Sequence, residues 1–393
     1  MKEQLSFNFL ETLPSNALIY VNDKPRAKLF SSLGFQTLTD ASEALGINLN
    51  NFSRYRLGRR GMPASFFKRL LDISKIPLEN FQNKIRISIG NTGHPIRLGP
   101  LISADAEWVY IAELIRGDGH ISDNLWYIVF VDRYDKPNKI VNHVKMFFTK
   151  KGVPSESFYI RRHGDALFLT IRSNIFAFIL KNLFQVPTGR KGDMKLPSFY
   201  WTSKIFAAAA IRAAFDAEGT VSLGKPSPRR ISITSISRSW LSDIRALLRL
   251  LNIDSEVHQE DRPGTTPIYR LRIYGQINLR RFLKTVKPVH PRKLIKLKKL
   301  LSTYRQNRVP EGTAKTKILA MLRDSGPMKR EQIAHSLHFK KNLLSWHLSS
   351  LQKKNLVRIT ERVYTNKGSY FKYGITELGL AEFSSNEDRP FRE

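Results

Sequence analysis

The sequence predicts an α+β protein whose centre is a duplicated αββαββα unit with pseudo-two-fold symmetry, flanked by two smaller, mainly helical domains. Two features reveal the duplication. An apolar helical segment ends in an acid and a glycine twice, at Asp118-Gly119 and, 100 residues later, at Glu218-Gly219. A lysine follows each acid at a matching distance, Lys191 after 73 residues and Lys293 after 75.

Composition indicates the class of partner. The chain has 393 residues, more than one hydrophobic core usually serves, so several domains are expected. Its 65 lysines and arginines against 33 acids give a net charge of +32. This excess favours a polyanion, with nucleic acid as the first expectation and a membrane surface as the weaker alternative.

The sequence lacks the patterns that are typical of secreted and membrane proteins. The sequence has no cysteine, which excludes disulfides and thiolate zinc sites and fits a reducing cytoplasm. It shows neither a secretory leader nor an apolar run of membrane-spanning length. We therefore expect a soluble cytoplasmic protein without a membrane partner, associated with the nucleoid if the organism is prokaryotic.

The N-terminal region divides into two parts. Residues 1–36 show no clear period and are treated as an N-terminal segment. Residues 37–90 have the pattern of a helix, a turn at Gly46 and a second helix, which is typical of a helix-turn-helix domain. Arg54 and Arg56 on the second helix could contact base edges or phosphates, and the segment that follows resembles phage-repressor domains. An ordinary helical hairpin with solvated arginines is the alternative.

The duplicated region comprises residues 98–200 and residues 201–308. Its predicted strands, Leu167–Arg172 and Ile268–Ile273 among them, alternate apolar with polar residues. One face of each sheet should then pack on helices, and the two polar faces should form a basic concave surface. On this interpretation the DNA-contacting side chains are Arg172, Arg230, Arg270 and Arg272, together with Arg292 in the basic stretch between Arg280 and Arg308.

Residues 313–383 form a third unit, with three helical segments followed by two strands. The order resembles a winged helix, with Ser345 and His347 on the presumed recognition helix and Lys367 at the wing. Because winged helices also bind proteins, both a DNA and a protein partner remain open. The polar residues 384–393 are expected to be disordered.

The two acid-Gly helices suggest a shared metal site. If their small residues pack together, Asp118 and Glu218 come close, and two adjacent carboxylates stay charged cheaply only with a cation between them. Mg²⁺, which prefers hard oxygen ligands, suits such a pair and the phosphates of a nucleic acid. A bound metal could activate water, while Lys191 and Lys293 would stabilise charge on the phosphate or help to polarise the water.

Two residues of the first helix depart from this pattern. Glu113 stands where a small residue is wanted at the helix seam, and Arg116 lies two positions before Asp118. We expect a buried Glu113 either to pair with an arginine such as Arg212 or to rotate the helix slightly. Either outcome would change the placement of the acid.

The motifs, their spacing and the segments ending at the two lysines, Gly189-Arg-Lys191 and Pro288–Lys293, resemble the two-repeat LAGLIDADG homing endonucleases. The resemblance covers roughly half of the chain. It implies that Asp118 and Glu218 bind metal, that Lys191 and Lys293 are active-site lysines, and that the strand faces form a DNA-contacting saddle. It also implies a monomer whose repeats act as an internal pseudo-dimer.

The function expected from the resemblance is site-specific, Mg²⁺-dependent cleavage of both strands of duplex DNA. One alternative is a transcription regulator that keeps the fold and binds DNA without cleavage, as in sporulation regulators with LAGLIDADG cores. The flanking helix-turn-helix units favour that alternative, whereas the presence of both acids and both lysines favours the nuclease. A maturase with an RNA partner is the third interpretation.

Overall fold

The computed structural model describes residues 4–90, 94–134, 138–224, 228–261, 266–304, 313–339, 341–365 and 368–387. The chain forms two compact units, Met1–Thr303 and Tyr304–Glu393, which are described separately. In the part of the chain covered by these ranges, no helix is long and apolar enough to cross a membrane.

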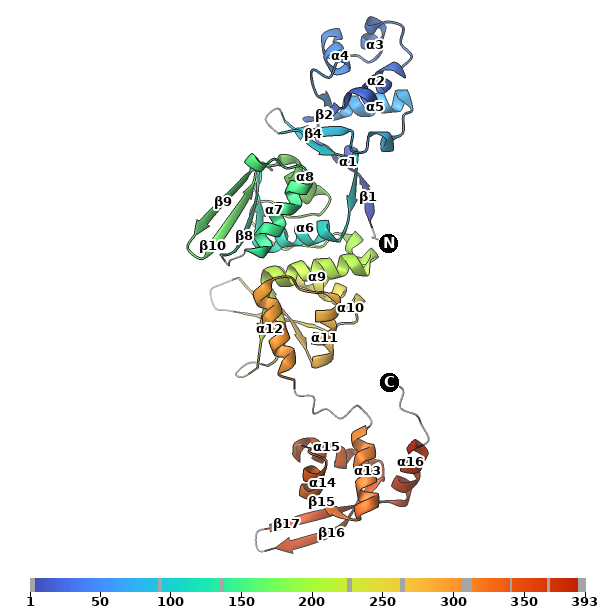
Figure 1. The fold of residues 1–393 in the computed structure, drawn as a ribbon, viewed down its shortest axis with the longest axis vertical. Helices are drawn as coiled ribbons and strands as arrows, with labels where there is room; N and C mark the ends of the chain where they lie inside the picture. Colours follow the sequence, from blue (N-terminus) through green and yellow to red (C-terminus); the bar gives the residue numbers. More distant parts are fainter. Residues whose placement is uncertain are drawn as a thin grey trace. The chain divides into compact units, whose positions relative to one another are not determined.

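The first unit begins with a small α/β part. A four-stranded antiparallel sheet has the order β3-β2-β4-β5 and is covered by helices (Figure 1). Its elements are β2 (Ala17–Val21), α2 (Asp23–Ser31), α3 (Leu38–Ala44), α4 (Leu49–Arg56), β3 (Met62–Pro63), α5 (Ala64–Ser74), a 3-10 turn (Leu78–Phe81), β4 (Ile85–Ile89) and β5 (Ile96–Leu98).

The helices predicted on either side of Gly46 are present. Thr37 and Asp40 form a capping box at the start of α3, and Asn48 accepts a hydrogen bond at the start of α4. Gly46 has φ +57°, a conformation that favours glycine, so the turn between the helices follows from the local sequence.

Residues 1–36 are more ordered than their pattern suggested. β2 lies inside the sheet between β3 and β4, and α2 packs on α5. Before them come β1 (Leu5–Asn8) and α1 (Phe9–Thr12). β1 pairs with β6 (Leu101–Ala104), which directly precedes the first repeat, so the N-terminus is tied to the centre of the unit.

The duplicated αββαββα unit is confirmed. Its two sheets have the corresponding orders β7-β8-β10-β9 and β11-β12-β14-β13. The first repeat comprises α6 (Ala106–Asp118), β7 (Gly119–Ile121), β8 (Ile128–Arg133), α7 (Lys139–Lys150), a 3-10 turn (Ser155–Ser157), β9 (Phe158–His163), β10 (Ala166–Ile171) and α8 (Asn174–Asn182). After a 3-10 turn (Ser198–Thr202), the second comprises α9 (Lys204–Glu218), β11 (Gly219–Ser222), β12 (Arg230–Ser235), α10 (Arg238–Leu250), β13 (Glu256–Glu260), β14 (Ile268–Tyr274), α11 (Gln276–Thr285) and α12 (Pro291–Ser302).

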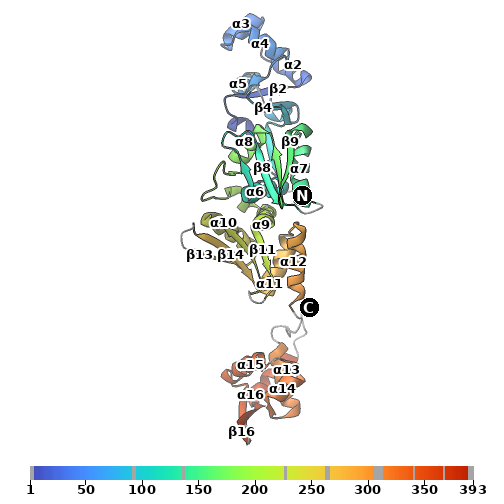
Figure 2. The ribbon, with the colours of Figure 1, turned by 90° about the vertical axis from the view of Figure 1, so that its left-hand side faces the viewer.

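Helices α6 and α9 lie side by side between the two sheets (Figures 1 and 2). Every residue of α6 from Trp108 to Arg116 is buried, which explains why the helix is apolar around most of its circumference. Caps fix where the helices begin: Asp105 accepts from two backbone N–H groups of α6, and Ser203 does so for α9. The seam between these helices is therefore the rigid centre of the unit.

The second unit packs helices on a three-stranded sheet of order β15-β17-β16. Its core includes Ile318, Leu344, Leu351 and Phe383. The elements are α13 (Thr313–Ser325), β15 (Met328–Lys329), α14 (Arg330–Ser336), α15 (Lys341–Lys353), β16 (Val357–Thr365), β17 (Gly368–Ile375) and α16 (Glu377–Glu387).

The last helix corrects one expectation. α16 continues to Glu387 and buries Phe383, so disorder from residue 384 onward is wrong for residues 384–387. Residues 388–393 lie outside the described ranges. The sequence pattern missed the end of this helix because its last turn is polar.

Candidate functional site

The two acids stand where a helix passes directly into a strand. Asp118 ends α6 and Glu218 ends α9, and the following glycines begin β7 and β11. Both glycines have extended rather than left-handed backbones. A Cβ on Gly119 would lie 2.7 Å from the Ile115 backbone, and one on Gly219 would lie 2.3 Å from the Phe215 carbonyl oxygen. Glycine is thus required for space at this abrupt turn.

Small residues bring the acidic ends of the helices together. A Cβ placed on Gly117 would lie only 2.6 Å from the Ala217 Cβ and 3.8 Å from the Glu218 Cγ. Any side chain at Gly117 would therefore push the helices apart. The packing that was expected from the small residues is present at the last turn, next to both carboxylates.

The environment disfavours two charged carboxylates. Burial, together with the nearby Glu218 carboxylate, raises the pKa of Asp118 from 3.8 to about 7. Burial also raises the pKa of Glu218, while Lys191 and Lys293 oppose that rise. The pair thus shares a low-polarity site in which added positive charge would be stabilising.

Both predicted lysines reach this site. The Lys191 Nζ donates to the Gly117 carbonyl, directly before Asp118. The Lys293 Nζ donates to the carbonyl oxygens of Phe215, Asp216 and Ala217 at 3.1, 2.6 and 2.5 Å. Each ammonium group therefore caps the end of the acid-bearing helix of its own repeat.

Burial lowers the pKa of both lysines, and the nearby carboxylates of Asp118 and Glu218 oppose this effect. The favourable interactions are mutual, since the same lysines hold down the pKa of Glu218. Two acids and two bases that are distant in sequence thus form one electrostatic cluster at the seam.

The residue two positions before each acid holds the segment that leads to the lysine. Arg116 donates to the Phe184 and Gln185 carbonyls, 2.6 and 2.9 Å away. Asp216 instead accepts from the Val289 and His290 N–H groups, at 3.2 and 3.1 Å. These positions carry opposite charges, yet each fixes the backbone near its own lysine.

Glu113 is accommodated by a partner other than the expected one. Its carboxylate accepts from Arg116 at 2.9 Å, from the Tyr200 hydroxyl at 3.0 Å and from the Trp240 indole at 3.2 Å. Arg212, the partner named from the sequence, donates to the Val286 carbonyl instead. Glu113 and Arg116 are 0% and 1% exposed, so a fully buried, well-satisfied ion pair replaces the small residue.

A further acid near the cluster, Asp132, was not identified from the sequence. Asp132, on β8, raises the pKa of Asp118 and lies 3.9 Å from the His290 ring. Tyr110 on α6 donates to Asp216 on α9 at 3.1 Å and so connects the repeats. Nothing in the sequence pattern singled out these residues, because the Asp132–His290 and Tyr110–Asp216 contacts join positions more than 100 residues apart.

The oxygen atoms at the seam supply only part of the ligands that a hard divalent cation needs. Asp118 and Glu218 offer carboxylate oxygens, which suit Mg²⁺ or a similar ion. The neighbouring Gly117 and Ala217 carbonyls accept from lysine ammonium groups, so they are engaged. Among the described residues no group of three or more His, Cys, Asp or Glu is placed to hold a metal. Further ligands would have to come from substrate and water.

The predicted basic side chains of the second repeat share one sheet face. Cross-strand pairs place Arg230, Arg270 and Arg272 on the side opposite the buried Ile231, Leu271 and Ile273. Glu260 bridges two of them, with its Oε1 2.9 Å from Arg270 and 2.6 Å from Arg272. These arginines are therefore positioned together by an acid before any ligand arrives.

The first repeat does not match the expected polar face. The positions that correspond across its ladder are mainly apolar: Val129 pairs with Thr170, and Val131 pairs with Phe168. Arg161 and Arg133 lie on the same side, at its margins. The basic character expected of this face is thus found only at its margins, because apolar side chains occupy the centre of the ladder.

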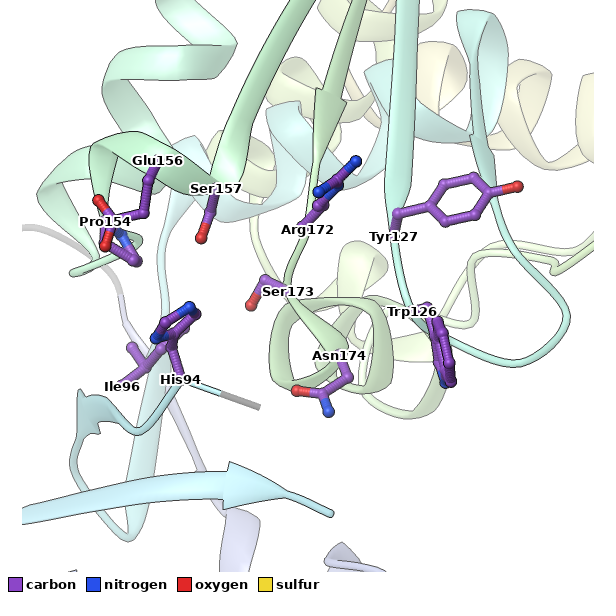
Figure 3. A pocket seen from close by; sticks show the side chains of 10 residues that line it. All are labelled: His94, Ile96, Trp126, Tyr127, Pro154, Glu156, Ser157, Arg172, Ser173 and Asn174. Atoms are coloured by element: carbon purple, nitrogen blue, oxygen red, sulfur yellow. The ribbon is translucent and has the colours of Figure 1, made fainter. Parts of the chain in front are cut away.

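Arg172 lies beyond the end of β10, at a cavity of about 340 Å³ (Figure 3). Trp126, Tyr127, His94 and Asn174 line the same cavity, which none of the four clustered acids and lysines reaches. We regard the seam, and not this cavity, as the candidate active site, because only the seam combines perturbed acids with lysines.

The other predicted DNA-contacting residues lie on α4, on α12 and in the second unit. Arg54 and Arg56 are exposed on α4, and Arg292 is exposed on α12 beside Lys293. In the second unit, the Ser345 hydroxyl accepts from Arg330. His347 is partly buried, and burial lowers its pKa. Trp346, the neighbour of His347 on α15, is more accessible, with 64% of its surface exposed. The sequence analysis did not single it out. Lys367 lies outside the described residues.

A family model adds an independent finding. Residues 206–287 match the model described as LAGLIDADG-like domain. The match spans α9 to α11 of the second repeat, apart from the first two residues of α9. This confirms the resemblance drawn from the motifs. The matched LAGLIDADG-like segment includes Glu218, and Lys293 follows shortly after its end.

Curated relatives share only part of their length with the chain. Elongation factor 2 from Methanopyrus kandleri is 31% identical over 134 residues, which are 34% of this chain and 10% of that protein. A DNA polymerase from Thermococcus hydrothermalis is 27% identical over 179 residues, or 44% of this chain and 10% of the polymerase. The chain thus spans about a tenth of the length of these relatives.

Two solved structures show likenesses with low scores. The homing endonuclease I-DmoI, in complex with DNA and Mn, has a TM-score of 0.37 and 16% identity, covering 47% of this chain and 98% of that chain. Full-length DUF199/WhiA from Thermatoga maritima has a TM-score of 0.36 and 14% identity, covering 64% of this chain and 92% of that chain.

Proposed function

We propose that the protein is a site-specific endonuclease that cleaves both strands of duplex DNA with the help of a divalent cation, Mg²⁺ in the first instance. The supporting observation is the cluster of Asp118, Glu218, Lys191 and Lys293 at the α6–α9 seam. A protein that only binds DNA gains nothing from two neighbouring carboxylates when burial, together with their mutual repulsion, raises the pKa of one to about 7.

The roles follow from the chemistry of the groups. Asp118 and Glu218 would hold the metal, which when bound would activate water and stabilise the leaving oxygen. The lysines lie beside both acids and would favour negative charge on a phosphate that enters the site. The segments held by Arg116 and Asp216 keep each ammonium group near its acid.

The net charge and the flanking units support DNA as the substrate. A charge of +32 favours binding to phosphates. In this proposal α3–α4 act as a helix-turn-helix and the second unit acts as a winged helix, and both extend contact with a long target site. One chain suffices, because the two repeats supply both halves of the site.

A DNA-binding regulator without cleavage is the second candidate. The observation that favours it is the engagement of the Gly117 and Ala217 carbonyls by lysine ammonium groups, which leaves fewer oxygens for a metal. An RNA-dependent maturase would share the basic surface and differ in its preferred nucleic acid.

The proposal is tested by selecting bound duplexes from a randomised library without divalent cations and then adding Mg²⁺ or Mn²⁺ to the selected duplex. The expected result is double-strand cleavage by the wild type. Asp118→Asn combined with Glu218→Gln should abolish it while leaving binding intact, since both changes are nearly isosteric. Specific binding without cleavage above that of the double variant would establish the regulator instead. Preference for structured RNA over every duplex would establish the maturase.

A further inference from the structure

The outward sheet faces of the two repeats differ in chemistry although their strands correspond. In the first repeat, cross-strand pairs align Val129 with Thr170, and Val131 with Phe168. In the second repeat, the pairs Ser232–Arg272 and Thr234–Arg270 occupy the matching central strands. Apolar groups therefore line the centre of one face and guanidinium groups the centre of the other.

The apolar centre in the first repeat is accessible. Val129, Val131 and Phe168 are only partly buried, whereas the opposite side of the same strands carries the fully buried Phe130 and Leu169. The side chains of the first group thus belong to a surface rather than to the core.

Two arginines flank this apolar centre. Arg161 lies 5.5 Å above the Phe168 ring, and Arg133 on the neighbouring strand pairs with Asp165 at 3.2 Å. A strip of apolar side chains flanked by arginines is complementary to a nucleic acid, which carries apolar groups between its phosphates. The large positive charge of the chain favours such an occupant over a neutral protein.

The major groove of duplex DNA offers two kinds of group that suit these faces. Each thymine presents a C5 methyl group, which alanine, threonine and phenylalanine side chains contact. Each guanine presents O6 and N7 acceptors, which arginine binds through two hydrogen bonds. Thr170, Phe168 and the two valines match the first, and Arg270 and Arg272 match the second.

Glu260 prepares the second face for guanine. Its Oε1 accepts a hydrogen bond from Arg272 and forms an ion pair with Arg270, so the two guanidinium groups are already held side by side in the protein without DNA. Orientation before binding reduces the conformational entropy that the long side chains lose in the complex.

We propose that the two repeats recognise half-sites of different composition: the first repeat binds a half-site through thymine methyl groups, and the second binds guanines through Arg270 and Arg272. The inference rests on the proposed binding of duplex DNA, and it concerns which bases determine specificity. It does not depend on cleavage.

The test uses base analogues in a duplex selected from a randomised library, with binding measured in the absence of divalent cations. Deoxyuridine in place of thymidine removes only the methyl group, and 7-deazaguanine in place of guanine removes only the N7 acceptor. Since the chain has no cysteine, a single cysteine introduced at His163 can carry an iron chelate whose cleavage pattern shows which half-site faces the first repeat.

Deoxyuridine in the half-site at the first repeat should weaken binding about fourfold for each methyl group contacted. The same change at the second repeat should have little effect. For 7-deazaguanine the expectation is reversed, with about fivefold or greater loss at the second repeat. Val131→Ser should reduce the deoxyuridine effect by the share of the methyl group that Val131 contacts, about fourfold, whereas His258→Ser, on the other sheet, should leave it unchanged.

The outcomes separate the two proposals. If no duplex is selected above random sequences, the proposed function fails. If a duplex is selected and bound tightly, but deoxyuridine has the same effect in both half-sites or none in either, the thymine inference is overturned while the proposed function stands. An unchanged deoxyuridine effect in Val131→Ser would also overturn the assignment to this face.

Discussion

The two repeats share one architecture, but the backbone segment that leads to the lysine is held by a cation in the first repeat and by an acid in the second. Near the first lysine, Arg116 binds carbonyl oxygens, whereas near the second Asp216 binds N–H groups. Arg116 has Glu113 as its buried counter-charge, and Asp216 accepts a hydrogen bond from the Tyr110 hydroxyl. Pseudo-symmetry is thus maintained in the backbone and at the acids, while the supporting contacts differ.

Removing one lysine at a time gives the largest expected asymmetry. If each lysine serves the acid of its own repeat, Lys191→Met and Lys293→Met should each slow one strand by about 100-fold or more and let nicked duplex accumulate. The strand that is cut slowly should differ between the two variants, as end-labelled duplexes would show. Equal slowing of both strands by both variants would mean that the lysines act jointly.

Replacing Arg116 should reduce the free energy of unfolding more than replacing Asp216. Arg116→Met leaves Glu113 buried without its cation, which should cost about 3–5 kcal/mol of unfolding free energy. Asp216→Asn keeps a neutral polar group at its site and should cost about 1–3 kcal/mol. Urea unfolding measures both.

A matched control accompanies this comparison. Arg116→Met combined with Glu113→Gln removes both charges and should recover part of the lost stability. If the double change is as damaging as the sum of the single changes, the ion pair does not explain the cost of removing Arg116.

The pH dependence of stability should reveal the buried acid. In the folded protein the pKa of Asp118 is about 7, above the ordinary 3.8, so between these values the folded state holds the extra proton. Unfolding free energy should therefore fall as pH rises from 4 to 7 without metal, by at most about 1.4 kcal/mol per pH unit from this group.

Asp118→Asn should remove this contribution and make the metal-free protein more stable near pH 7. Exposed Asp254 provides the control, since Asp254→Asn should leave the pH profile unchanged. A wild-type profile that parallels that of Asp118→Asn between pH 4 and 7 would contradict the raised pKa.

The smallest expected effect sharpens the contrast between the sheet faces. Glu260→Gln removes a negative charge beside Arg270 and Arg272, which should tighten non-specific duplex binding about two- to fivefold at low salt. Discrimination between guanine and adenine in the second half-site should fall, because the arginines lose their fixed orientation. Tighter binding with undiminished discrimination would show that Glu260 contributes charge alone.

Sequence reasoning located the elements that depend on local patterns. Alternation identified β10 and β14 to within about a residue, and Gly164, with φ +56°, lies in the turn between β9 and β10. Residues 17–31 escaped notice because one short strand and one short helix give too few residues for a reliable period.

The sequence by itself determined the duplication, the two acid-Gly helix ends and the lysines in register, since repeats and spacing are properties of the chain. Only the tertiary structure decided the Tyr200 and Trp240 contacts of Glu113, the tether at Asp216 and the apolar face around Val131 and Phe168. These depend on which side chains meet across the seam or across a ladder, and a hydrogen-bond partner more than 60 residues away leaves no periodic trace in the sequence.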